Sequence, residues 1–189
     1  MESKVKQILE YLGNYHTNVE RKQGFMGNYY SPLIDTIYIA ENFENAEIPK
    51  DAKDMNKKAA ELIVLCHECI HSVQSKCLHL LNTLFASISI VLSLVCIFIG
   101  VFWTSPIWLK AVTLTILALS IVFRIILELG AIKGSTKVAV ELVKSGLIED
   151  VSEQDIEEGE IYINKHRFAA LMQMISDKII FLILVLVIK

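Results

Sequence analysis

Residues 77–109 read CLHLLNTLFASISIVLSLVCIFIGVFWTSPIWL and contain no aspartate, glutamate, lysine or arginine. Because a helix crosses the hydrocarbon core of a bilayer with about 20 apolar residues, this run is long enough for one crossing and a turn into a second. Pro106 disrupts helices, and it lies between Trp103 and Trp108, whose rings suit a membrane–water interface. The stretch therefore predicts a transmembrane helical hairpin.

The hairpin divides the 189-residue chain into four predicted segments. The apolar stretch at residues 178–189 is too short to span a bilayer alone. We expect a helix that reaches back to Phe168 either to dip into the bilayer or to cross it with tilt. The predicted segments are 1–76, an N-terminal polar head; 77–127, the transmembrane hairpin; 128–177, a helical polar segment; and 178–189, an apolar membrane segment that ends a helix from about residue 157.

Composition and charge argue against a nucleic-acid-binding protein and against a secreted, disulfide-rich protein. The net charge is −3 and 53% of the residues are hydrophobic, which gives no indication of a nucleic-acid partner. The four cysteines, Cys66, Cys69, Cys77 and Cys96, do not form the pattern of a secreted disulfide framework. Lysines and arginines gather in residues 1–77 and 128–178, so we expect both polar segments to face the cytoplasm. Arg124 lies only about one turn from the end of the second membrane helix, where its side chain can reach the headgroups.

The polar head carries three local structure signals. Met1–Gly13 reads as an amphipathic helix without an apolar signal segment, with Val5, Ile8, Leu9 and Leu12 on one face. Thr36–Ala40 is the clearest strand candidate, and we expect it to form an edge strand that pairs with an extended substrate. Residues 51–76 read as a helix. Further along, Gly146 ends one helix and Ser152 with Asp155 begins the next.

The sequence His67-Glu68-Cys69-Ile70-His71 lies on the predicted helix of residues 51–76. Two histidines four residues apart share one helix face, with Cβ atoms about 5–6 Å apart, close enough to bind one zinc ion. Glu68 directly follows the first histidine, where its carboxylate can act as a general base toward water activated by the metal. The competing interpretation is that both histidines are polar residues of an amphipathic helix at the membrane surface.

A catalytic zinc site needs a third protein ligand and one open position. Two antiparallel membrane helices return the chain to the side from which it entered, and Glu128 is the first carboxylate after that return. The topology therefore favours Glu128 as third ligand, but an ordinary acid at a helix end explains its position equally well.

Residues 66–74, Cys-His-Glu-Cys-Ile-His-Ser-Val-Gln, are similar to the HExxHxxQ motif of the bacterial neutral zinc metallopeptidases typified by the YugP membrane protein. Weaker similarity extends over about residues 28–175. The resemblance implies a catalytic zinc bound by His67, His71 and Glu128, with Glu68 as base. From its position alone, one turn beyond His71, Gln74 could orient a ligand or be a plain polar residue at the membrane edge. The chain departs from the family in lacking its initial membrane helix and in having Cys66 and Cys69 around the motif.

Three alternatives remain open. Cys66 and Cys69 could contribute to a structural zinc site, although on one helix they point away from the histidine face. The protein could instead be a non-catalytic, membrane-anchored zinc-binding or interaction protein. An intramembrane protease of the site-2 type would need a later Asn-Pro-Asp-Gly-like segment, which the sequence lacks.

For an oxyanion-stabilising donor, Tyr162, His166 and Arg167 are candidates.

Together these features predict a mainly α membrane protein with a zincin-like HExxH helix that continues towards a transmembrane hairpin, and a small β element in the head. The expected function is that of a zinc metallopeptidase, a hydrolase that uses Glu68 as base and one catalytic Zn²⁺ held by His67, His71 and Glu128. Its expected partners are a peptide or protein substrate and the lipid bilayer. We expect it in the bacterial cytoplasmic membrane, with the active site facing the cytoplasm.

Overall fold

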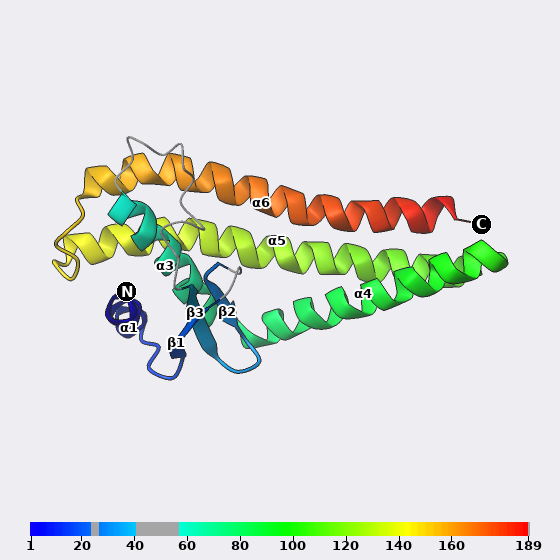
Figure 1. The fold of residues 1–189 in the computed structure, drawn as a ribbon, viewed down its shortest axis with the longest axis horizontal. Helices are drawn as coiled ribbons and strands as arrows, with labels where there is room; N and C mark the ends of the chain where they lie inside the picture. The colour runs from blue at the N-terminus through cyan, green and yellow to red at the C-terminus, as the bar shows by residue number, and fades with distance from the viewer. Residues whose placement is uncertain (24–26, 41–56, 189) are drawn as a thin grey trace. The chain divides into compact units, whose positions relative to one another are not determined.

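The computed structural model describes residues 1–23, 27–40 and 57–188, without the side chains of residues 162, 164, 166, 170 and 174 (Figure 1). Residues 51–56, the start of the predicted motif helix, lie outside the described part. The described elements are mainly helices, and in chain order they are α1 (Glu2–Tyr11), β1 (Asn18–Lys22), β2 (Tyr29–Ser31), β3 (Thr36–Ala40), α3 (Lys57–Val73), α4 (Lys76–Phe102), α5 (Ile107–Lys144) and α6 (Glu153–Val187).

The chain divides into two compact units. The first unit comprises Met1–Lys76 and Leu129–Arg167, and the second comprises Cys77–Glu128 and Phe168–Lys189. Helices α5 and α6 therefore each contribute one part to the first unit and another part to the second.

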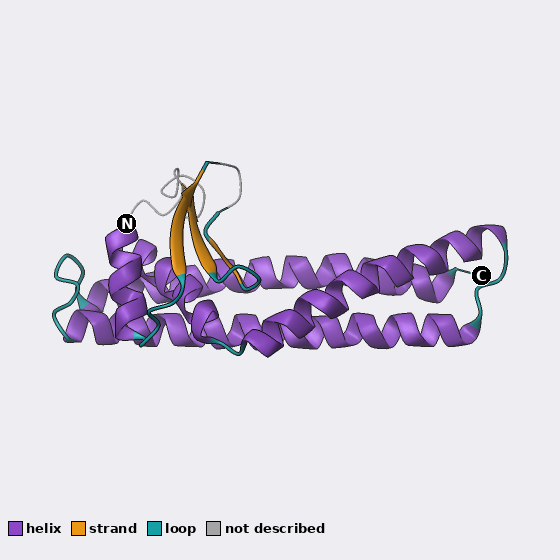
Figure 2. Cartoon of the chain, turned by 90° about the horizontal axis from the view of Figure 1, so that it is seen from below, coloured by secondary structure: helices purple, strands orange, loops and turns teal. Residues whose placement is uncertain are grey.

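The small sheet of the first unit, orange in Figure 2, has the strand order β1-β3-β2. Strand β1 runs parallel to β3 and β2 runs antiparallel to it. The prediction of a strand at Thr36–Ala40 is confirmed, and four of its five residues are buried. Its expected place at the sheet edge is wrong, because β3 has a hydrogen-bonded neighbour on both sides and has no open edge for a substrate.

The core of the first unit joins α1, the sheet and α3 to the parts of α5 and α6 that belong to this unit. Helix α1 buries Val5, Ile8 and Leu9, as its amphipathic pattern predicts. Each fully buried Leu or Ile side chain contributes about 1.5–3 kcal/mol relative to an exposed one. The largest fully buried side chains here are Ile8, Ile37, Ile39, Leu62, Ile63, Leu65, Leu142 and Ile156.

The start of α6 is fixed by reciprocal hydrogen bonds of the kind seen in a capping box. The Ser152 N–H donates to Asp155 Oδ2 at 2.9 Å, and the Asp155 N–H donates to Ser152 Oγ at 3.2 Å. The preceding helix ends at Lys144, and Gly146 has a φ of +71°, which is a left-handed conformation that glycine tolerates. Both predicted helix boundaries in this region are confirmed.

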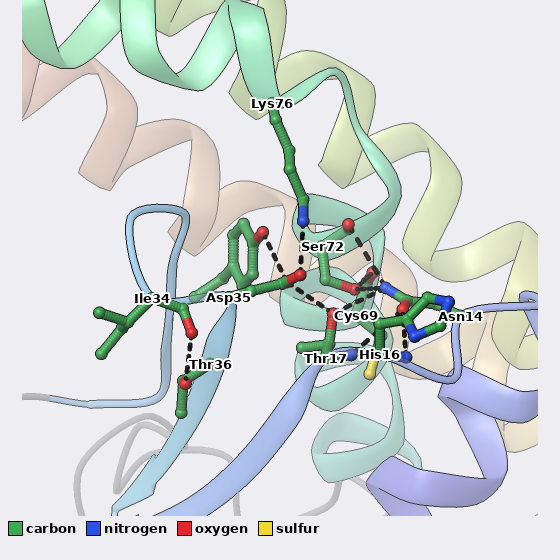
Figure 3. A network of polar contacts seen from close by, with 10 residues as sticks. Asn14, His16, Thr17, Ile34, Asp35, Thr36, Cys69, Ser72 and Lys76 are labelled. Carbon is green, nitrogen blue, oxygen red and sulfur yellow. Dashed lines mark hydrogen bonds and ion pairs between the residues drawn. The ribbon is translucent and has the colours of Figure 1, made fainter.

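Asp35 organises a polar network between the sheet and the end of α3 (Figure 3). Its Oδ1 accepts hydrogen bonds from Thr17 at 2.8 Å and from the Tyr30 hydroxyl at 3.0 Å, and its Oδ2 pairs with Lys76 at 2.5 Å. Burial alone would raise the pKa of Asp35, but the hydrogen bonds from Lys76, Thr17 and Tyr30 outweigh it and hold the pKa below its ordinary value. The ionised carboxylate therefore ties the turn between β2 and β3 to the start of α4.

The motif helix ends earlier than its predicted boundary at residue 76. Helix α3 ends at Val73 and α4 begins at Lys76, so the two are separate helices with Gln74 and Ser75 between them. The Gln74 N–H still donates to the Ile70 carbonyl at 3.1 Å, but Ser75 occupies the position before the first residue of α4, where serine is favoured.

In the second unit, α4 and the first part of α5 form the predicted hairpin. Within the described part of the chain, three helical segments are long and apolar enough to cross a membrane, namely Lys76–Phe102, Ile107–Lys144 and Arg167–Val187. Trp103 and Trp108, on either side of the turn, are both largely exposed. These features are compatible with a membrane location. Inside the unit, the rings of Phe85 and Phe123 stack with centroids 5.4 Å apart.

Candidate metal centre

Helix α3 places His67, Glu68 and His71 in a buried position. These three residues are only 5%, 9% and 7% exposed to solvent, in that order. Alanines and branched apolar residues earlier in α3 fix the helix in the core of the first unit, so the histidine face is held by packing on a rigid element. Buried polar groups of this kind need specific partners, since burial without them is costly.

The two imidazoles meet through their Nε2 atoms, which are 3.1 Å apart. The rings are nearly perpendicular, with centroids 4.6 Å apart and an interplanar angle of 89°. Two nitrogens that bind one tetrahedral zinc at about 2.0–2.1 Å lie about 3.3 Å from each other. The observed separation is close to that value, so the histidine pair fits a shared metal ion.

Gln74 determines which nitrogen of His71 is available. Its Oε1 lies 2.9 Å from His71 Nδ1. Because a carbonyl oxygen only accepts hydrogen bonds, this contact places the ring proton on Nδ1 and leaves Nε2 with its lone pair. An imidazole oriented in this way by a hydrogen bond to its other nitrogen is typical of metal ligands.

Glu128 completes a group of three buried residues. His67, His71 and Glu128 each offer one ligand atom, and these atoms lie within 4.8 Å of one another. The structure therefore brings together the three residues predicted as ligands, in a buried group that could hold a metal ion. Two imidazoles and one carboxylate are a donor set that suits zinc and leaves a fourth position for water or substrate.

Arg124 lies one helical turn before Glu128 in α5 and pairs with it. Its Nη2 is 2.8 Å from Glu128 Oε1, and the Arg124 side chain is 36% exposed. The sequence led us to expect that Arg124 reaches the headgroups, but its guanidinium pairs with a carboxylate on the same helix. A cation here can orient the Glu128 carboxylate, as groups outside the ligand shell commonly do.

A backbone donor from β2 orients Glu68. The Tyr30 N–H donates to Glu68 Oε2 at 3.1 Å, and the same residue's hydroxyl donates to Asp35. The Asp35 network therefore fixes the residue that holds the Glu68 carboxylate. Glu68 does not belong to the group of three candidate ligands, which agrees with a role in proton transfer instead of coordination.

Cys66 and Cys69 are buried in the core of the first unit and do not belong to the candidate ligand group. Burial raises the pKa of both thiols, and for Cys66 the charge of Arg167 offsets this only in part. On α3 the two thiols lie in the apolar core, apart from the ligand atoms of His67, His71 and Glu128. This finding disfavours the alternative of a structural Cys/His site.

Of the three candidates for an oxyanion-stabilising donor, Arg167 is the one whose side chain the structure describes. The side chains of Tyr162 and His166 lie outside the described part of the structure. Arg167 Nη2 donates to the Val64 carbonyl at 3.5 Å, which is a contact with the backbone of α3.

Gly130 is needed for the position of Gln74. A Cβ atom at Gly130 would lie 2.8 Å from Gln74 Nε2, so a methyl group there must displace the amide that holds His71. We expect Gly130→Ala to weaken zinc binding by about tenfold or more, the usual cost of losing an outer partner of a ligand. Folding stability should change little or rise, because alanine is favoured over glycine within a helix by about 0.5–1 kcal/mol.

Gly134→Ala is the matched control for this prediction. It lies one turn further along α5, and its added Cβ would meet Ile70 Cδ1 at 3.2 Å instead of a site residue. Zinc titration and thermal unfolding of both variants separate the two effects. Equal zinc affinity in both variants would show that the Gln74 contact does not support the metal.

No protein-family profile, curated protein or solved structure matches this chain. The described residues themselves give the basis for a function, namely a buried His–His–Glu group with an adjacent glutamate, and three helical segments long and apolar enough to cross a membrane.

Proposed function

We propose that the protein is a membrane-embedded zinc metallopeptidase that hydrolyses peptide bonds. The observation that carries this proposal is the buried group of His67, His71 and Glu128, with Glu68 directly beside the first ligand in α3. The proposal includes a zincin-like arrangement of the N-terminal head and membership of the YugP-type family. So does the orientation in a bacterial cytoplasmic membrane with the site facing the cytoplasm.

The ion, when bound, would supply a Lewis acid that polarises the scissile carbonyl and makes a water molecule acidic near neutral pH. Glu68 accepts the proton of the attacking water at its carboxylate and later delivers it to the leaving amine. His67, His71 and Glu128 hold the ion, while Gln74 and Arg124 orient His71 and Glu128.

The sheet suggests a position for an extended substrate. Because β3 is the central strand, the substrate's partner is instead an edge strand, and we assign this role to β2. Strand β2 contains Tyr30, whose N–H contacts Glu68, so a peptide paired with β2 would run beside the proposed base.

Metal removal tests the proposal. We expect the purified full-length protein in neutral detergent to contain about one zinc per chain and to cleave members of a denatured-proteome peptide library. A chelator should abolish cleavage, and added Zn²⁺ should restore it. Zinc without cleavage of any library peptide would support the non-catalytic zinc-binding alternative, and a protein that neither contains nor binds zinc would refute the metal site itself.

A further inference from the structure

A cavity lies entirely within the second unit, between α4 and the parts of α5 and α6 that belong to this unit. Its volume is about 350 Å³, within the roughly 300–1,000 Å³ of small-molecule sites. Representative lining residues are Asn82 and Ser93 from α4, Leu117 and Arg124 from α5, and Lys178 and Phe181 from α6. None of these residues belongs to the candidate metal group.

Two cations line this cavity although both lie in segments apolar enough to cross a membrane. Charged residues in such segments are costly and usually have a function. Glu128 pairs with Arg124, whereas Lys178 Nζ donates to the neutral Ser120 hydroxyl at 2.9 Å. Asp177 also lines the cavity but is an exposed residue. Of the two lining cations, Arg124 has a carboxylate partner, whereas the hydrogen bond described for Lys178 goes to a neutral hydroxyl.

Polar atoms with unused hydrogen-bonding capacity also line the cavity. Ser93 is 0% exposed, and its Oγ has no hydrogen-bond partner among the described residues. The same holds for Asn82 Oδ1. Such buried atoms are unfavourable unless a ligand or water satisfies them. The remaining lining is mostly apolar and includes Leu117 and Phe181, which suits a hydrocarbon chain.

We propose that this cavity binds an anionic amphiphile, with its acidic head at Lys178 and Arg124 and its acyl chain along the apolar lining. Asn82 and Ser93 are about three turns apart on α4, so they offer polar contacts at two different levels of the cavity, and the ligand's head meets at most one of them. Free fatty acids and anionic phospholipids both have this chemistry. Lys178, Ser93 and Asn82 lie outside the candidate metal group, whereas Arg124 also pairs with Glu128, so Lys178 is the residue that tests this site separately from the metal centre.

Native mass spectrometry of the delipidated full-length protein in neutral detergent tests the site. Oleate, phosphatidylglycerol and phosphatidylcholine are titrated separately. We expect oleate or phosphatidylglycerol to bind at least about tenfold more tightly than phosphatidylcholine, because a charge-assisted hydrogen bond is worth about that factor. Whichever of the two anions binds more tightly identifies the source of the ligand.

Two variants locate the binding, each with a matched control. Lys178→Met should weaken binding of the anion about tenfold, whereas Lys137→Met, at an exposed lysine of the first unit, should not change it. Ser93→Leu should block the cavity, whereas Ser87→Leu, at an exposed serine of the same helix, should not. If Ser93→Leu fails to fold, Lys178→Met decides alone. Equal affinity for all three lipids, or unchanged anion binding by Lys178→Met, overturns the proposal.

Discussion

Replacing Glu68 with glutamine is expected to leave zinc bound and to lower the rate of peptide hydrolysis by about 100- to 10,000-fold, the usual contribution of a general base. Glutamine has nearly the same size and can still accept the hydrogen bond from the Tyr30 N–H, but it cannot take a proton from water. Glu68 does not belong to the ligand group, so the metal should stay. The measurements are single-turnover cleavage of a library peptide and zinc content by elemental analysis.

Glu61→Gln is the matched control, because it makes the same substitution on the same helix at a partly exposed residue. It should retain both zinc and activity. A Glu68→Gln protein that cleaves as fast as wild type would show that Glu68 is not the base. Loss of zinc from the same variant would instead make Glu68 a ligand and would require a new assignment of the site.

The parts of the fold that follow from periodic patterns could be predicted from the sequence. Helix α1 shows its buried face at helical spacing, and β3 is a short β-branched and aromatic run. The uncharged stretch between Cys77 and Leu109 determines the hairpin almost alone, because few other structures use an apolar run of that length.

The rest of the sheet could not be predicted in this way. Strand β1 has the sequence Asn-Val-Glu-Arg-Lys, in which only Val19 is apolar, and it forms because β3 offers it a parallel partner. The same partner makes β3 central, so a local pattern was unable to distinguish an edge strand from a central one. The break at Gln74 and Ser75 has no proline or glycine to mark it.

The site shows the same division between local and long-range information. His67 and His71 meet because of helical spacing, which the sequence contains directly. The position of Glu128 near the two histidines depends on the hairpin, which returns the chain to the same side. The sequence alone left the role of Glu128 open. The Tyr30 N–H is a backbone group, so no side-chain pattern could indicate its contact with Glu68. Helical spacing also allowed the pair between Arg124 and Glu128, but a position near a membrane suggested a different partner.

Replacing Glu128 with glutamine is expected to weaken zinc binding by more than about 100-fold, because even outer partners of a ligand contribute about 10- to 100-fold. The amide oxygen is a neutral and much weaker ligand than a carboxylate, whereas it can still accept a hydrogen bond from Arg124. The fold should therefore survive, as thermal unfolding can verify. Competition of the purified variant against a fluorescent zinc chelator measures the affinity.

Two further variants separate a ligand from an ordinary ion-pair partner. Glu141→Gln changes a partly exposed acid of the same helix and should leave zinc affinity unchanged. Arg124→Gln removes the ion pair but keeps the carboxylate, so we expect it to weaken zinc binding by only about 10- to 100-fold. If Glu128 were only the partner of Arg124, neither substitution would change zinc binding. That result would remove Glu128 from the site and leave the histidine pair without its third ligand.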